Sequence, residues 1–168
     1  MTSVVADAHA REQLLVKCWM THDARWFNAV AQEFGIEAAN RLNQAAVREA
    51  AKVEAQRVGR ALGLAPPRDA AGCLKVQQAL IGVLGPDLLD YDAQVEGPDS
   101  YKIRVKRCFA HENVEKAGIA AHYDCGIFAR VEGWMDGMGV RHDIAPPLKG
   151  CLMAQGKECV HTVRVHTN

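Results

Sequence analysis

Three cysteines in the last third of the chain, Cys125, Cys151 and Cys159, are the residues best suited to chemistry. Cys125 opens a predicted helix and the other two flank a predicted tight turn, so the three thiols would come from separate elements. In a chain without a secretory signal, such a pattern indicates metal binding before it indicates disulfides. The trio therefore predicts a metal site, and zinc is the ion that thiolates favour.

The last two cysteines can share a site only if the turn between them has a suitable length. Directly paired residues of an antiparallel hairpin point to the same face. A two-residue loop at Gly156-Lys157 would pair Ala154 with Cys159 and send Cys151 to the opposite face. A loop of odd length brings both sulfurs to one side, and a left-handed glycine at Gly156 permits it.

A rival set of donors lies between the first strands and the cysteine-headed helix. Cys108-x-x-His111 is followed ten residues later by His122-x-x-Cys125, a symmetric pattern of two sulfurs and two nitrogens. This donor set suits tetrahedral zinc. The structural alternative is that Cys125, Cys151 and Cys159 are small buried residues that bind no ion.

The elements that position these residues begin with a helical half. Thr21 is expected to cap a helix that ends at Gly35, and Asp69 is expected to cap another after the Pro66-Pro67 linker. Cys18 and Cys73 lie in apolar helical surroundings and are interpreted as core residues. The helices expected from apolar spacing and Ala content cover residues 14–19, 21–34, 36–62 and 69–84.

The second half alternates between strand and helix patterns. The expected elements are strands over 91–96 and 101–107, a helix over 124–138, a segment over 140–144, and strands around 151–154 and 160–165. This order predicts an α+β fold. A helical N-terminal layer is followed by an antiparallel sheet built from two hairpins with a helix between them. We expect one domain over residues 1–168, with a helical part over 1–86 and a mixed part over 87–168.

The C-terminal motifs resemble those of known families. Cys125-Gly126-Ile127-Phe128, Glu132-Gly133, Gly139 and the stretch 151–163 are similar to the C-terminal signature of V4R (4-vinyl reductase) domains, over residues 100–166. Arg107-Cys108-Phe109 and Tyr123-Asp124-Cys125 resemble the L-2-amino-thiazoline-4-carboxylate hydrolase family. The stretch 19–27 is similar to a related bacterial family of unknown function.

The V4R resemblance implies a small-molecule-binding module, in which zinc is held by three cysteines and a glutamate. The cysteines correspond to Cys125, Cys151 and Cys159, whereas Leu148 stands where the glutamate would be. A fourth donor must therefore come from elsewhere, or the position is left to water or substrate. The candidate donors are Cys108, His111, His122, Asp124 and His142.

The hydrolase resemblance implies an activated thiolate with a base beside it. Cys125 is the candidate nucleophile because a helix N-terminus lowers the pKa of a thiol. His122 or His111 is the candidate base, and Asp124 or Asp136 would orient it. A zinc-bound Cys125 could not also attack a substrate, so this hypothesis is an alternative to the first.

The charge balance and the hydropathy of the chain limit the kinds of binding partner that we expect. Twenty basic and twenty acidic residues cancel, which argues against nucleic acid or an anionic membrane as a partner of the whole surface. No apolar run reaches the roughly 18 residues of a membrane span, and we expect a cytoplasmic protein. The leading prediction is a zinc-containing module that binds a small, fairly apolar molecule between the helical layer and the sheet. The helix over 36–62 is the expected homodimer surface. The alternative is a thiol- or zinc-dependent hydrolase of a small carboxylate or amide.

Overall fold

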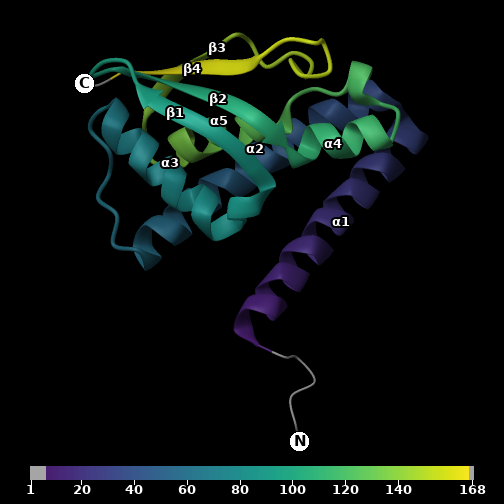
Figure 1. The fold of residues 1–168 in the computed structure, drawn as a ribbon, viewed down its shortest axis with the longest axis horizontal. Helices are drawn as coiled ribbons and strands as arrows, with labels where there is room; N and C mark the ends of the chain where they lie inside the picture. Colours follow the sequence, from purple (N-terminus) through teal and green to yellow (C-terminus); the bar gives the residue numbers. More distant parts are fainter. Residues whose placement is uncertain (1–6, 167–168) are drawn as a thin grey trace, which may run out of the picture. The chain divides into compact units, whose positions relative to one another are not determined.

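The computed structural model describes residues 7–166. The chain forms two compact units, one ending at Ala39 and the other beginning at Asn40. Helices come first and a four-stranded antiparallel sheet follows, so the α+β prediction is confirmed (Figure 1). The helices are α1 (Ala8–Phe34), α2 (Ile36–Ala61), α3 (Ala70–Leu84), α4 (Phe109–Lys116) and α5 (Gly126–Gly137). The strands are β1 (Leu89–Val95), β2 (Ser100–Cys108), β3 (Arg141–Ala145) and β4 (Cys159–His166).

The first unit consists of α1 and the first turn of α2. The Asp7 carboxylate caps α1 by accepting a hydrogen bond from the Ala10 amide at 2.7 Å. The expected break at Thr21 is wrong, because the Thr21 hydroxyl donates to the Lys17 carbonyl one turn back and leaves the helix continuous. Gly35 ends α1 at a φ of 87°, as predicted. Cys18 is exposed on α1, which corrects its interpretation as a core residue.

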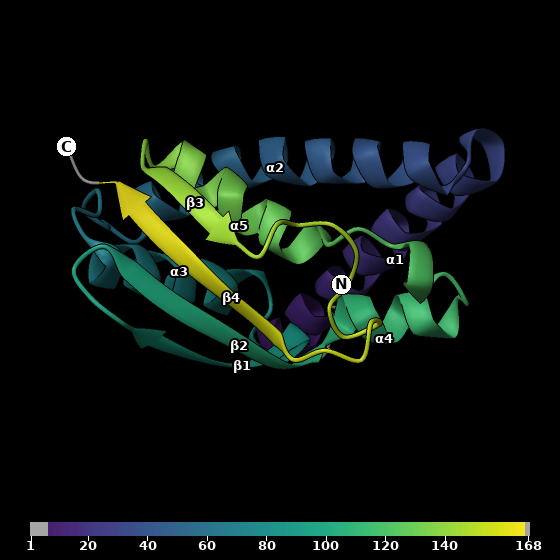
Figure 2. The same ribbon diagram turned by 90° about the horizontal axis from the view of Figure 1, so that it is seen from above.

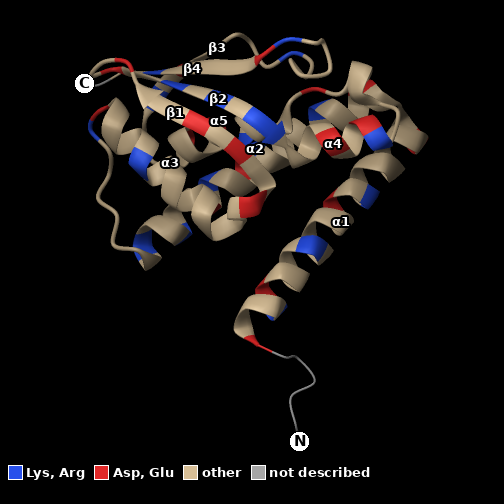
Figure 3. Ribbon diagram, viewed as in Figure 1, with Lys and Arg blue, Asp and Glu red and all other residues tan. Residues whose placement is uncertain are grey.

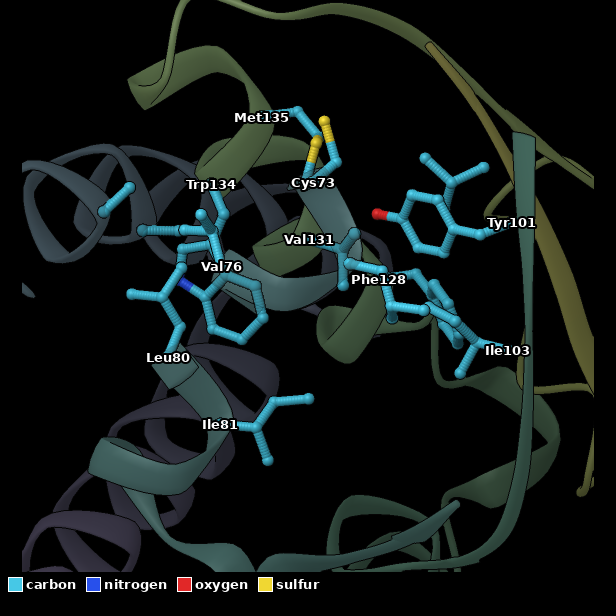
Figure 4. Close-up of a cluster of buried hydrophobic side chains, with 14 of the residues drawn as sticks. Cys73, Val76, Leu80, Ile81, Tyr101, Ile103, Phe128, Val131, Trp134 and Met135 are labelled. Atoms are coloured by element: carbon cyan, nitrogen blue, oxygen red, sulfur yellow. The ribbon is translucent and has the colours of Figure 1, made fainter. Parts of the chain in front are cut away.

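In the second unit, helices pack against one face of the sheet, whose strand order is β1-β2-β4-β3 (Figure 2). Alternate residues of β2 and β4 face these helices, and Tyr101 of β2 and Val163 of β4 are both fully buried. Figure 4 shows Tyr101 and Ile103 of the sheet facing Phe128 and Val131 of α5. As expected, Asp69 caps α3, accepting from the Gly72 amide at 2.7 Å.

The helices α2 and α5 approach so closely that glycine is required between them. A Cβ atom on Gly133 would lie 2.3 Å from the Arg48 carbonyl oxygen, and one on Gly137 would lie 2.7 Å from that of Lys52. Such distances are well inside van der Waals contact, so any larger residue would push the helices apart. This contact sets the spacing between α2 and α5, the helix whose N-cap residue is Cys125.

The second hairpin differs from its prediction. Its two strands are β3 and β4, and residues 146–158 connect them without adding a strand. The expected strand around 151–154 is instead a single helical turn closed by two hydrogen bonds. The Lys157 amide donates to the Leu152 carbonyl and the Gly156 amide to that of Met153. With Gly156 at a φ of 69°, this is a Schellman motif, so the left-handed glycine ends a helical turn.

A β-bulge in β2 turns Cys108 toward the core. Tyr91 pairs with Val105 and Asp90 with Arg107, so Lys106 is an extra residue in β2. Strict alternation after Val105 would bury position 107 and expose position 108. The extra residue reverses that order, and Cys108 is buried.

Charges of both signs are interspersed along the chain (Figure 3). On the outer face of β2, Lys102, Arg104 and Lys106 each pair with a carboxylate. Across residues 7–166, no helix is both long and apolar enough to cross a membrane.

Candidate functional site

Four cysteines share one site, which we call the thiol cluster. Its members are Cys108, Cys125, Cys151 and Cys159. Negative charge on Cys108 or Cys151 raises the pKa of Cys125, and charge on any of the other three raises the pKa of Cys159. The predicted trio and Cys108, predicted as a further donor, are therefore near enough to affect one another's pKa.

Each member of the thiol cluster comes from a different element. Cys125 is the N-cap residue of α5, as predicted, and Cys108 is the N-cap residue of α4. Cys159 begins β4 directly opposite Val105 of β2, on the core side of the sheet. Cys151 opens the helical turn within residues 146–158. Three members therefore lie at the ends of regular elements and one lies in a connecting segment.

Burial controls the protonation of three of these thiols. It raises the pKa of Cys125 to about 11, and the backbone N–H groups of Phe128 and Ile127 lower it only in part. Burial likewise raises the pKa of Cys159 to about 12, and it raises that of Cys108. The expectation that a helix N-terminus would leave Cys125 with a lowered pKa is therefore wrong, because desolvation outweighs the helix amides. Near neutral pH these three are thiols, which are poor nucleophiles.

Cys151 has a different environment. Its Sγ lies 3.7 Å from Nδ1 of His111, and Nε2 of His111 lies 3.5 Å from a carboxylate oxygen of Glu115. His111 and Glu115 are one turn apart on α4, and Cys151 is half-buried. A thiol, an imidazole and a carboxylate in this order form the arrangement in which a base activates a sulfur nucleophile. Sequence reasoning proposed His111 as base but placed the nucleophile at Cys125.

Polar side chains of α2 hold the segments that carry the thiol cluster. Nε2 of Gln44 donates to the carbonyls of Cys125, at 3.3 Å, and Leu148, at 3.2 Å. The buried Asn40 amide donates to the His122 carbonyl at 2.6 Å and accepts from the Asp124 amide at 3.1 Å. Sequence reasoning missed both residues. The signal was their i, i+4 spacing among the alanines of this helix.

The other proposed donors lie in different settings. The Asp124 carboxylate accepts from the Gly150 amide at 2.7 Å and so anchors the segment before Cys151. His122 is exposed, and the contact it makes to Asn40 is through its backbone. His142 of β3 lies near Asp136 and lowers the pKa of that carboxyl, after the larger effect of Arg48.

Glu132 and Asp136 are not a free pair of carboxylates. Arg48 of α2 binds both, at 3.0 Å to Glu132 and 2.7 Å to Asp136. The contact lowers the pKa of Asp136 and raises that of Arg48. Asp136 therefore has no part in orienting a histidine base at the thiol cluster.

His161 was also missed, although it lies two residues after Cys159. It is 3% exposed on the inner face of β4, and its ring stacks on Phe128 with centroids 3.8 Å apart. Burial lowers its pKa to about 4, so the imidazole is neutral near pH 7. The signal was Cys159-x-His161, which puts both side chains on one face of a strand.

The arrangement of the donors is not yet that of a bound ion. Over the described residues 7–166, no three Cys, His, Asp or Glu side chains already stand in positions that could hold a metal. The thiols are neighbours, but their side chains would have to turn toward a common point to ligate an ion.

Comparison with known protein families identifies one family, whose function is unknown. Residues 9–135 match a family of unknown function, DUF6125. No curated protein matches the chain. The matched segment contains Cys108, His111 and Cys125, whereas Cys151 and Cys159 lie beyond it.

Proposed function

We propose that this chain, which belongs to the DUF6125 family of unknown function, is a zinc-binding module whose ion is held by the thiol cluster. The observation that carries the proposal is that four cysteines from separate elements lie near enough for charge on one to raise the pKa of another. Thiolate sulfur is the donor that structural zinc sites use most, and imidazole nitrogen is the usual complement.

Burial and metal binding act on these thiols in opposite directions. Without an ion, desolvation keeps Cys125 and Cys159 protonated, since their pKa values are about 11 and 12. A divalent cation favours the thiolates, so binding would release protons and tighten with rising pH. The ion would join the starts of α4, α5 and β4, and its binding energy would add to the stability of the fold.

The resemblance to V4R domains supports a small, fairly apolar molecule as the ligand of this module. The metal would then serve structure, by holding the start of α5 against the sheet. This role is consistent with the position of Cys108 in the core and with the packing of the partly buried Cys125 and Cys159 against it.

Metal content tests the proposal. Protein purified without a metal-affinity tag should contain about one zinc per chain by plasma mass spectrometry. Cys125→Ser and Cys159→Ser should each lose the zinc and lower the melting temperature. Cys18→Ser, on the exposed surface of α1, is the matched control and should change neither. A wild-type protein with no metal and six titratable thiols would remove the proposal.

A thiol-dependent hydrolase is the second candidate, favoured by the contact of Cys151 with His111. In this hypothesis the His111 imidazole takes the proton of Cys151, and the sulfur attacks the carbonyl carbon of a small amide. The new C–S bond replaces the C–N bond, and the amine leaves with the proton from the imidazolium. Water then cleaves the thioester and releases the carboxylic acid.

Modification of the thiol separates this candidate from the first. If Cys151 is a nucleophile, iodoacetamide should label it and abolish any amide hydrolysis; if Cys151 is a zinc ligand, labelling should become rapid only after a chelator removes the metal. His111→Gln should slow both the labelling and the hydrolysis, whereas His122→Gln, at an exposed histidine, is the matched control. Equal labelling of His111→Gln and wild-type protein would argue against an activated thiol.

A further inference from the structure

Cys151 is the half-buried member of the thiol cluster that has a base beside it. Its Sγ lies 3.7 Å from Nδ1 of His111, and Nε2 of the same ring lies 3.5 Å from a carboxylate oxygen of the largely exposed Glu115. A sulfur that small solutes can reach, with a base in contact, is a site for reaction with electrophiles. A carbonyl carbon is one such electrophile, and the oxygen of a hydroperoxide is another.

Two side chains hold the segment that leads into Cys151. The Asp124 carboxylate accepts from the Gly150 amide at 2.7 Å, and Nε2 of Gln44 donates to the Leu148 carbonyl at 3.2 Å. These contacts tie the segment to the residue before the N-cap of α5 and to α2. The Cys151 sulfur therefore has a defined position, although it lies in a connection between strands.

Cys108 brings a second sulfur to the same histidine. It is the N-cap residue of α4, and His111 is the third residue of that helix. The side chain of an N-cap residue is placed to fold back toward the N–H groups of the first turn. The amides of His111 and Ala110 both lower the pKa of Cys108, so its sulfur lies near them. One cysteine thus lies near the backbone of His111, and the other contacts its ring.

Cys108 is also the thiol on which Cys151 acts most directly. Among charged groups, Cys151 has the largest effect on the pKa of Cys108. Around Cys125 and Cys159, by contrast, Cys108 has a larger effect than Cys151. The favoured thiol partner of Cys151 is therefore Cys108.

We propose that Cys151 and Cys108 form a peroxide-reactive pair, in which a small hydroperoxide oxidises Cys151 and Cys108 then closes a disulfide with it. The proposal goes beyond the zinc function and does not depend on it, because the pair reacts without a metal. Its basis is the placement of both sulfurs at one histidine, together with the difference in their burial. Cys151 is half-buried and meets the oxidant first, whereas Cys108 is buried and reacts with the product.

The chemistry takes place in two steps. First, the Cys151 sulfur attacks the terminal oxygen of the hydroperoxide ROOH, and the O–O bond breaks. The His111 imidazole takes the thiol proton and passes it to the leaving alkoxide, which departs as the alcohol ROH and leaves Cys151 oxidised to a sulfenic acid. Second, the Cys108 sulfur attacks the Cys151 sulfur, so an S–S bond replaces the S–O bond. The hydroxide leaves with the Cys108 proton as water.

Peptide mass spectrometry of the full-length, chelator-treated protein tests the pair. An equimolar amount of hydrogen peroxide should lower the number of titratable thiols by two, from six, and link the peptides that contain Cys108 and Cys151. Dithiothreitol should restore all six. Cys18→Ser, on the exposed surface of α1, is the matched control and should still form the linked peptides. Linkage of Cys151 to Cys125 or Cys159 instead, or no link within one chain, would overturn the proposal.

Variants test the order of the two steps. Cys108→Ala, an apolar change at a buried position, should stop the reaction at a sulfenic acid on Cys151 that dimedone traps. Cys151→Ser should leave Cys108 reduced in the same amount of peroxide. Oxidation of Cys108 in Cys151→Ser would contradict the assigned order. The wild-type peptide map decides the pairing even where Cys108→Ala fails to fold.

The role of the histidine has its own measurement. His111→Gln should slow formation of the disulfide about tenfold or more, because the proton transfer to the alkoxide is lost. His122→Gln, at an exposed histidine, is the matched control and should react at the wild-type rate. Equal rates in His111→Gln and the wild type would contradict the placement of the reaction at this ring.

The outcomes also separate this pair from the proposed zinc function. Linked Cys108 and Cys151 peptides in a chain that takes up no zinc support the pair and remove only the zinc function. A zinc-containing protein whose Cys108 and Cys151 stay unlinked after chelation and peroxide overturns the pair and leaves the zinc function.

Discussion

Three of the clustered cysteines and the fourth have the same side chain but belong to two different regions. Cys108, Cys125 and Cys159 stand at the ends of regular elements and face the core, whereas Cys151 stands in a connecting turn beside His111. Burial raises the pKa of each of the first three, and in the second region a base lies within reach of the sulfur. The comparison shows that burial and a neighbouring base, rather than the side chain alone, determine whether a cysteine can act as a nucleophile.

Gly133→Ala should have the largest effect, because it disrupts the close packing of α2 against α5, the helix that Cys125 caps. The added methyl would sit 2.3 Å from the Arg48 carbonyl and force α5 away from α2. We expect a loss of about 3 kcal/mol in the free energy of unfolding, measured by urea denaturation. Gly82→Ala is the control, since a Cβ there meets nothing within 4 Å and should stabilise α3 by about 0.5–1 kcal/mol. Similar effects of the two changes would contradict the close helix contact.

Alkaline pH should weaken the metal-free protein through the buried thiols. The ordinary pKa of a thiol is about 9, and that of Cys125 is about 11 in the folded protein. Between these values the unfolded chain gives up a proton that the folded chain retains, so stability falls as pH rises from about 9 to 11. The loss should approach about 2–3 kcal/mol for this thiol. Cys125→Ala should flatten the decline in melts recorded across this range, and an unchanged slope would contradict the assignment.

Alkylation should separate the two regions by rate. Iodoacetamide at pH 8 should modify Cys151 about tenfold or more faster than Cys108, Cys125 and Cys159, because it reacts with thiolates that it can reach. Peptide mass spectrometry over a time course would measure each site. Exposed Cys18 provides an internal reference for an unassisted thiol. Faster modification of Cys125 than of Cys151 would contradict the assignment of Cys151 as the more reactive thiol.

Glu158→Gln should have the smallest effect, although position 158 lies next to the partly buried Cys159. Its carboxylate pairs with Arg104 at 3.0 Å, and both side chains are largely exposed. Exposed pairs of this kind contribute little, so unfolding free energy should change by less than about 0.5 kcal/mol. Thermal melts would measure it, and a larger loss would show that the buried region extends to the surface of β4.

Much of the fold was predictable because its signals are local. The glycine at 35, the cap at Asp69 and the first hairpin follow from short motifs whose meaning does not depend on distant residues. Thr21 failed as a cap because a hydroxyl inside a helix can bond one turn back. Gly156 was rightly expected to be left-handed, but hairpin bulges and helix ends both need that conformation.

The sequence predicted which cysteines belong to the candidate site better than it predicted their protonation and their contacts. Cysteine spacing indicated the gathering of Cys125, Cys151 and Cys159, which the structure brings together with Cys108. Sequence alone could not weigh burial against the helix amides at Cys125, because burial comes from residues far along the chain. Nor could it show that Asp124 would bind the Gly150 amide.

The bulge at Lys106 makes the identity of the site depend on a count of residues. If the strand kept Lys106 but ran without the bulge, simple alternation from Val105 would bring the guanidinium of Arg107 to the inner face of the sheet and turn the Cys108 sulfur out to solvent. Deleting Lys106 would instead remove the bulge and leave Arg107 outward and Cys108 inward. A change of length between Val105 and Cys108 therefore keeps Cys108 on the inner face only where a bulge absorbs the extra residue.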